Sequence, residues 1–306
     1  MKTTYTYEAP IEFHPGEILE EKLEELGMAK NEFAIRTGKP EKTIIAVLKG
    51  DSSITPDMAV KFESVTNIPV HFWLKIQRNY DEYVAREKRK ADIAEAVQWS
   101  KHFPVNELIH KGCLPELNSA EEKADALLRF FGLADHRAWE NFYLNQQLKV
   151  TFRISLSKIK DPYSVSAWLR MGERQALEKK SRGYSAADFR KSLEKIRRLS
   201  GTSPEDSVGK VQQLCQQAGV RFITTPSLNK APISGASRWF MDAPLIQLVE
   251  KFSRKEIFWF TFFHEAGHIL LHGKREIFLE NIDYPDLDKQ KEDEADAFAR
   301  EWLGKQ

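Results

Sequence analysis

The chain has 306 residues, a formal net charge of +1 at pH 7, 42% hydrophobic residues and 30% charged residues. This length provides material for two or three domains. Because the net charge is near zero, any nucleic-acid contact must come from a local patch. The two cysteines lie far apart in the sequence, which indicates reduced thiols and a cytoplasmic location. We predict neither a signal peptide nor a membrane-spanning segment, and therefore no membrane partner.

Five short helices are predicted after an irregular arm at residues 1–13. Apolar residues recur at helical spacing, and Gly27, Gly38 and Gly50 mark three of the helix ends. Thr55-Pro56 supplies an N-cap followed by proline at the first helical position. The predicted helices are 15–26, 30–37, 40–49, 55–65 and one that starts at Pro69.

Two short helices joined by a glycine-containing turn are typical of helix-turn-helix domains. Three segments of this region stand out: His14-Pro15-Gly16-Glu17-x-Leu19, Ile54-Thr55-Pro56-x-Met58-Ala59 and Phe72-Trp73-Leu74-x-Ile76-Gln77-x-x-Tyr80. Together they resemble the HigA-type branch of the repressor-like (XRE) helix-turn-helix family, over about residues 12–84. The resemblance implies that residues 40–49 form the recognition helix. Its candidate DNA contacts are Lys39, Glu41, Lys42, Thr43 and Lys49, with the lysines on phosphates and Thr43 and Glu41 on base edges.

The predicted recognition helix departs from that family at Ile45 and Ala46, where a serine and a long basic residue usually follow the threonine. Few side chains that read bases remain there. Two interpretations stay open: a domain that binds duplex DNA, as a homodimer on an operator such as its own promoter, or a domain that mainly binds protein.

Residues 78–100 are predicted to form a charged helical connector, and residues 101–200 a helical middle domain. Ser119-x-x-Glu122 and Ser185-x-x-Asp188 are capping signals. Basic residues between 179 and 198 indicate a solvated surface or a second nucleic-acid patch. The middle domain contains no catalytic constellation that we can identify.

A small sheet is predicted after residue 200. Ser203-Pro204 opens a helix to Gln217, and strands are expected at residues 220–224, 233–240 and 244–249. We expect Leu245–Val249 to be an edge strand that holds a substrate backbone. Residues 274–290 are expected to form an acidic loop.

His264-Glu265-x-x-His268 is the strongest chemical signal in the chain. Residues four apart share one face of a helix, so two such imidazoles can bind one zinc ion. Glu265 would act as the general base toward a water that zinc acidifies. Ser253-x-x-Glu256 predicts a capping box, and Gly273 predicts the helix end. The alternative, two structural histidines on a core helix, leaves a costly buried carboxylate without a partner.

A third zinc ligand is expected in the acidic segment 292–299. This segment is predicted to be a helix with the apolar stripe Ala295, Phe298, Ala299 and Trp302. Glu294 borders the stripe and is our first choice, with Glu292 next. His272 is less suitable because it lies about 12 Å along the helix from His264.

These motifs together resemble the ImmA/IrrE family of zinc metallopeptidases, over about residues 205–303. The resemblance rests on residues 262–272, on Glu294-Ala295-Asp296-x-Phe298-Ala299, and on the preceding segments 233–239 and 244–248. It implies a gluzincin-like site with Zn²⁺ held by His264, His268 and Glu294, and with Glu265 as the base. Members of this family cleave or regulate repressor proteins of stress and mobile-element circuits.

The sequence therefore predicts a mainly α protein with a small β-sheet (α+β). The expected domains are a helix-turn-helix domain at 1–84, a helical connector and middle domain at 85–200, and a zincin-like domain at 201–306. The expected function is a cytoplasmic, antitoxin-like transcriptional regulator with a zinc endopeptidase domain that acts on a repressor or toxin protein. The alternative is a non-catalytic antitoxin or repressor whose peptidase fold senses a signal or binds a protein.

Overall fold

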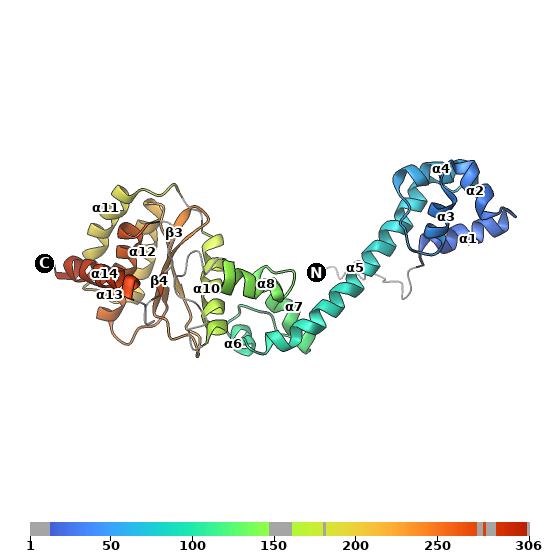
Figure 1. Cartoon of the computed structure of the whole chain (residues 1–306). Coiled ribbons are helices and arrows are strands. Elements are labelled where there is room, and N and C mark those ends of the chain that lie inside the picture. Colours follow the sequence, from blue (N-terminus) through green and yellow to red (C-terminus); the bar gives the residue numbers. More distant parts are fainter. Residues whose placement is uncertain (1–12, 147–160, 180–181, 274–277, 280–285, 305–306) are drawn as a thin grey trace. The chain divides into compact units, whose positions relative to one another are not determined.

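The computed structural model describes residues 13–146, 161–179, 182–273, 278–279 and 286–304. The chain divides into two compact units, residues 1–92 and 93–306 (Figure 1). Helix α5 (Val70–Ser100) contains the point of division.

The first unit is a small helical domain. It contains α1 (Pro15–Glu25), α2 (Lys30–Thr37), α3 (Glu41–Leu48), α4 (Pro56–Thr66) and the first part of α5. The four predicted short helices are confirmed to within a residue at nearly every end. The predicted fifth helix and the predicted connector form one helix, α5. The domain core is apolar and includes Leu19, Phe33, Ile44, Met58, Phe62 and Trp73.

The segment His14-Pro15-Gly16-Glu17 starts α1 and lets it approach α3. The Nδ1 atom of His14 accepts a hydrogen bond from the Gly16 backbone N–H at 2.9 Å, and the Glu17 carboxylate accepts one from the His14 backbone N–H at 3.1 Å. A Cβ atom on Gly16 would collide with the carbonyl oxygen of Val47 in α3. Glycine is therefore required by the close packing of α1 against α3.

The second unit begins with helices rich in aromatic side chains. They are α6 (Val105–His110), α7 (Ala120–Phe131), α8 (Arg137–Trp139), the π-helix η1 (Glu140–Gln146) and α10 (Pro162–Leu177). The predicted capping box of Ser119 with Glu122 is present at the start of α7. Phe103, Phe131, Trp139 and Tyr163 contact one another in the core.

A four-stranded sheet has the order β1-β3-β2-β4. Its strands are β1 (Arg221–Thr225), β2 (Gly235–Phe240), β3 (Ala243–Val249) and β4 (Phe278–Leu279). Strand β3 pairs parallel with β1 and antiparallel with β2, which also pairs antiparallel with β4. The expected edge role of Leu245–Val249 is therefore wrong, because both sides of β3 are already paired. Strand β4 is the edge next to β2.

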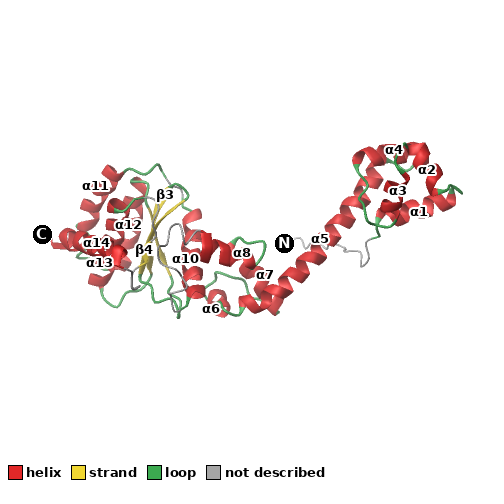
Figure 2. Cartoon of the chain, in the orientation of Figure 1, coloured by secondary structure: helices red, strands yellow, loops and turns green. Residues whose placement is uncertain are grey.

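Helices cover both faces of the sheet. Helices α11 (Ala186–Arg197), α12 (Pro204–Gln217), α13 (Lys255–Leu271) and α14 (Asp286–Gly304) share one core with the sheet residues Phe222, Ile246 and Leu248. Helix α10 lies on the other face (Figure 2), where its Ala176 packs with Ile223 and Leu245. The predicted mainly α class with a small sheet is confirmed.

One core extends across the predicted boundary at residue 200. Trp139 and Trp168 belong to the same apolar cluster as Ile233, Ala236 and Leu279. The structure groups residues 93–306 together, and the three sequence-based domain ranges stay a prediction.

The expected acidic loop at 274–290 is partly wrong. Strand β4 and the start of α14 take up residues 278–279 and 286–290, while 274–277 and 280–285 lie outside the described residues. Within the described parts of the chain, every helix is too short or too polar to cross a membrane.

Candidate functional site

Helix α13 carries the His264-Glu265-x-x-His268 motif through the middle of the second unit. Eleven of its residues are buried, among them Phe258, Phe262 and Phe263, because the sheet lies on one side and α14 on the other. The helix begins at Lys255 with Arg254 as N-cap, and that side chain makes no capping hydrogen bond. The predicted capping box of Ser253 and Glu256 is therefore wrong. Gly273 follows the last turn with φ of 82°, as predicted for a helix end.

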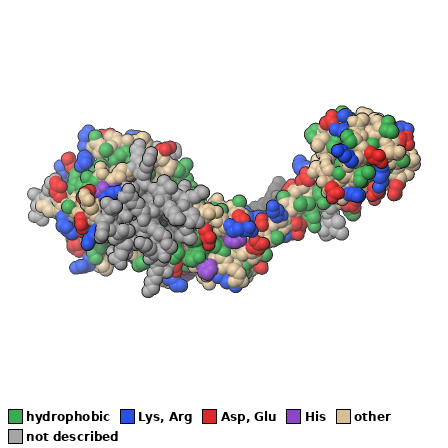
Figure 3. Space-filling model, in the orientation of Figure 1, with side chains coloured by type: hydrophobic (Ala, Val, Ile, Leu, Met, Phe, Trp, Pro, Cys, Tyr) green, Lys and Arg blue, Asp and Glu red, His purple; other side chains and the backbone are tan. Residues whose placement is uncertain are grey.

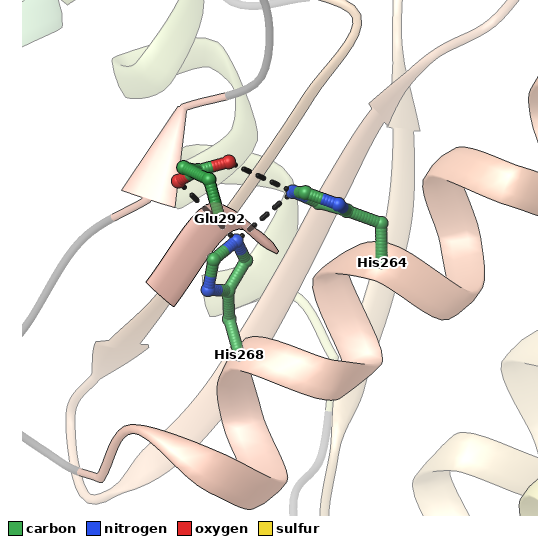
Figure 4. Close-up of side chains that lie close together, drawn as sticks. All are labelled: His264, His268 and Glu292. Atoms are coloured by element: carbon green, nitrogen blue, oxygen red, sulfur yellow. Dashed lines mark hydrogen bonds and ion pairs between the residues drawn. The ribbon is translucent and has the colours of Figure 1, made fainter. Parts of the chain in front are cut away.

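Two imidazoles of α13 and one carboxylate of α14 converge on one point (Figure 4). The Nε2 atoms of His264 and His268 are 3.0 Å apart. The Glu292 carboxylate lies 3.1 Å from His264 Nε2 through Oε2 and 3.5 Å from His268 Nε2 through Oε1. One ligand atom from each residue lies within 4.8 Å of the others.

Asp296 fixes the orientation of His264. Its Oδ1 atom lies 3.0 Å from His264 Nδ1, and its Oδ2 atom accepts a hydrogen bond from Arg300 at 2.7 Å. A carboxylate held by an arginine accepts hydrogen bonds, so the Nδ1 atom of His264 carries the hydrogen. The Nε2 atom of a neutral His264 then presents a lone pair toward Glu292. This carboxylate–histidine pair is the usual outer support of a metal-binding histidine.

The charges at this point fit a divalent cation. Burial lowers the pKa of His268 to about 4, so the imidazole is neutral near pH 7. Burial alone would raise the pKa of Glu292, but the imidazoles of His264 and His268 beside it lower that pKa to about 2. The Oε1 atom of Glu292 is buried and, 3.5 Å from His268 Nε2, meets no hydrogen-bond donor in the described part of the chain. Neutral imidazoles and an ionised carboxylate are the donor set that zinc binds.

Glu294 lies apart from this point, which corrects our first choice of third ligand. Its side chain is 46% exposed and accepts hydrogen bonds from His272 Nε2 at 3.0 Å and from Gln290 at 2.9 Å. The reason is the helical period: one turn back from Ala295 leads to residues 291 and 292. Glu292 therefore lies on the buried stripe, whereas Glu294 lies beside it.

Glu265 is fully buried, and its carboxylate packs against strand β2. An added Cβ atom on Gly235 would lie 2.7 Å from Glu265 Oε1 and 2.7 Å from Thr261 Cγ2. The small residue in β2 therefore makes room for the candidate base.

Two further residues lie at the candidate metal centre although the sequence did not predict a role for them there. Asp296 lies one helical turn after Glu292, a spacing that could have revealed it as a second acidic residue facing α13. Phe278 stacks on the His268 ring with a centroid distance of 3.8 Å and an interplanar angle of 8°. It lies in a two-residue strand, and nothing in the local sequence indicates that contact.

The predicted DNA contacts all lie at or near α3. Lys42 and Lys49 are exposed on the same face of the helix as Ile45 and Ala46, which are half-buried. Glu41 is exposed and Thr43 half-buried, on the two flanks of that face. Lys39 lies in the turn before α3 and forms an ion pair with Asp57 of α4. Figure 3 shows acidic and basic side chains interspersed on the face of the chain that it draws.

Comparison with known proteins gives matches at both ends of the chain. Residues 215–303 match the family model Peptidase_M78, described as the IrrE N-terminal-like domain. A segment of 80 residues is 30% identical to the uncharacterized HTH-type transcriptional regulator YddM of Escherichia coli (strain K12), and covers 26% of this chain and 83% of that relative.

Solved structures of similar proteins include an addiction module antidote protein of the HigA family from Coxiella burnetii. It is 35% identical, with 28% of this chain and 92% of that chain covered, at a TM-score of 0.26. The Pseudomonas aeruginosa antitoxin HigA with the higBA promoter is 25% identical, with 26% of this chain and 86% of that chain covered, at a TM-score of 0.25.

Proposed function

Because the chain belongs to the HTH-type transcriptional regulators and carries an IrrE-like domain of the M78 peptidase family, we propose that it is a DNA-binding regulator with an active zinc endopeptidase site. Its helix-turn-helix domain is of the HigA type. The proposed location is the cytoplasm. The proposed substrate is a repressor, toxin or other protein partner of the same regulatory circuit.

The convergence of His264, His268 and Glu292 carries the peptidase proposal. Both imidazoles and the carboxylate point at one another, and Asp296 supports His264 from the outside. Bound zinc would supply an acidified water and polarise a substrate carbonyl. Glu265 lies between the two histidines in the sequence, is fully buried, and would accept the proton of that water as general base.

The helix-turn-helix relative supports the DNA-binding part of the proposal. The exposed Lys42 and Lys49 side chains would contact phosphates, and Thr43 and Glu41 would reach base edges. We propose a homodimer on a two-fold symmetric operator, such as its own promoter, because dimeric helix-turn-helix proteins bind half-sites about one turn apart.

A comparison of the wild-type chain with Glu265→Gln tests the peptidase. Both zinc-loaded proteins are incubated with a peptide library prepared from a proteome, and new amino termini are identified by mass spectrometry. We expect both proteins to bind zinc equally, because Glu265 is not in the ligand set. Cleavage should fall by about 10²- to 10⁴-fold in the variant. Identical termini with both proteins would instead favour the alternative, a non-catalytic sensing or protein-binding module.

A further inference from the structure

A chain of hydrogen bonds leads from His268 away from the candidate zinc site. His268 Nδ1 lies 2.9 Å from His272 Nδ1, and His272 Nε2 lies 3.0 Å from Glu294 Oε2. The side chains of His268 and His272 are almost fully buried, at 0% and 4% exposure, whereas Glu294 is half-exposed. The sequence offers both His272 and Glu294 as candidate zinc ligands, but the proposed cleavage reaction assigns no role to either side chain.

The positions of the hydrogens follow from the acceptor at the end of this chain. An ionised carboxylate only accepts hydrogen bonds, so the Nε2 atom of His272, 3.0 Å from Glu294 Oε2, carries a hydrogen. A neutral His272 then has a lone pair on Nδ1. The Nδ1 atom of His268 must therefore donate to it, which leaves the lone pair of His268 on Nε2, facing His264 and Glu292.

We propose that His272 and Glu294 form a positioning relay that holds His268 in the tautomer and orientation that zinc requires. The inference rests on the zinc site proposed above. His268 thereby receives the same kind of outer support that Asp296 gives directly to His264. The difference is that the carboxylate acts on His268 through an intervening imidazole, because the end of α13 places His272 between His268 and Glu294.

Two neighbours hold the relay in place. The ring of Phe278 stacks on the His268 ring, and its centroid lies 5.3 Å from the centroid of the His272 ring. Both imidazoles therefore have restricted rotation. Gln290 donates to Glu294 Oε1 at 2.9 Å and leaves Oε2 for His272.

Zinc affinity of full-length variants tests the relay, by competition with a chromophoric chelator. His272→Phe keeps a ring but removes the acceptor, and should weaken zinc binding by about 10- to 100-fold, the usual effect of losing an outer-shell partner. His272→Gln can accept through its amide oxygen and should retain more affinity than His272→Phe. Glu294→Gln can still accept from His272 and should stay close to wild type, whereas Glu294→Ala should be weaker. Asp293→Ala removes a carboxylate from the same helical turn at an exposed position and should have no effect.

A second readout separates positioning from a general loss of structure. The visible absorption bands of the cobalt(II)-loaded protein report ligand geometry. They should change in His272→Phe and remain unchanged in Asp293→Ala, while the unfolding temperature of all metal-free variants stays the same.

Wild-type affinity and an unchanged cobalt spectrum in His272→Phe would refute the relay. Loss of zinc in Glu294→Gln, as severe as in Glu292→Gln, would also refute it and make Glu294 a ligand. If zinc binding survives both His264→Ala and Glu292→Gln, the proposed metal site itself fails, a result distinct from failure of the relay alone.

Discussion

Gly235 determines where the Glu265 carboxylate can lie. A methyl group at this position would press against Glu265 Oε1, Thr261 and Leu248, all at 3.0 Å or less. The neighbouring Thr261 and Leu248 are fully buried and have little room to move. The proposed base is therefore held by a backbone feature in β2 as well as by its own helix.

We predict that Gly235→Ala lowers cleavage by at least about 10-fold, and by no more than the 10²- to 10⁴-fold that a general base contributes. The zinc ligands lie on α13 and α14, so metal content should remain at the wild-type level. Activity is measured on the peptide library at equal zinc occupancy. Wild-type cleavage by Gly235→Ala would mean that the position of Glu265 does not depend on this glycine.

The ligand set illustrates what spacing can and cannot predict. His264 and His268 follow from the four-residue spacing, and the structure brings them within 3.0 Å of each other. Glu292 and Glu294 are both acidic and both close to the apolar stripe, but only Glu292 lies one helical turn before Ala295, on the stripe itself. The helical period could therefore have separated the two, whereas the packing of that stripe against α13 depends on residues distant in sequence.

We predict that Glu292→Gln loses stoichiometric zinc, because a neutral amide is a poor replacement for the buried carboxylate beside two imidazoles. Metal content of the purified protein is measured by elemental analysis. Full zinc content in Glu292→Gln would show that the third ligand lies elsewhere.

The bounds of the short helices could be predicted because their ends carry local signals. Lys30–Thr37 and Pro204–Gln217 have the predicted bounds, set by Gly38 and by the Ser203 cap. Strand order could not be predicted in the same way. The sequence 244–249 is equally apolar for an edge or a central strand, and only pairing with the distant β1 makes β3 central. The two-residue β4 is too short to leave a periodic signal.

Gly16 gives a prediction about the packing of α1 against α3. Gly16→Ala should destabilise the first unit by about 1–3 kcal/mol, the usual cost of overpacking, because the added carbon meets a rigid backbone carbonyl rather than a flexible side chain. Gly209 in α12 is the matched control, since it is exposed and an added Cβ meets nothing within 4 Å. Gly209→Ala should be neutral or stabilising by up to about 1 kcal/mol. Chemical denaturation with circular dichroism measures both, and equal stabilities would contradict the packing argument.

The positive charges at α3 predict how DNA binding depends on salt. Lys42→Ala in α3 and Lys49→Ala at its C-terminal end each remove an exposed cation, so each should weaken binding and reduce the slope of log affinity against log salt by about 1. Lys30→Ala is the control, because Lys30 is exposed on α2 and paired with Glu20. Fluorescence anisotropy with a duplex from the promoter of its own gene measures the slopes. An equal effect of all three substitutions would place the DNA contact away from α3.

The division into two compact units leads to a last prediction, that zinc and DNA binding are separable. The first unit has its own apolar core, and the candidate zinc residues all lie in the second unit. Zinc should stabilise the second unit by about 2.7 kcal/mol at a free concentration 100 times its Kd, since it binds only the folded state. Removal of zinc by a chelator should therefore lower the unfolding temperature of the transition assigned to the second unit.

DNA affinity of the same sample should change less than 10-fold, or about 1.4 kcal/mol. Calorimetry measures the unfolding temperature, and fluorescence anisotropy measures the DNA affinity. A larger change in DNA affinity on chelation, absent in a Glu292→Gln variant, would show that the metal site and the helix-turn-helix domain are energetically coupled.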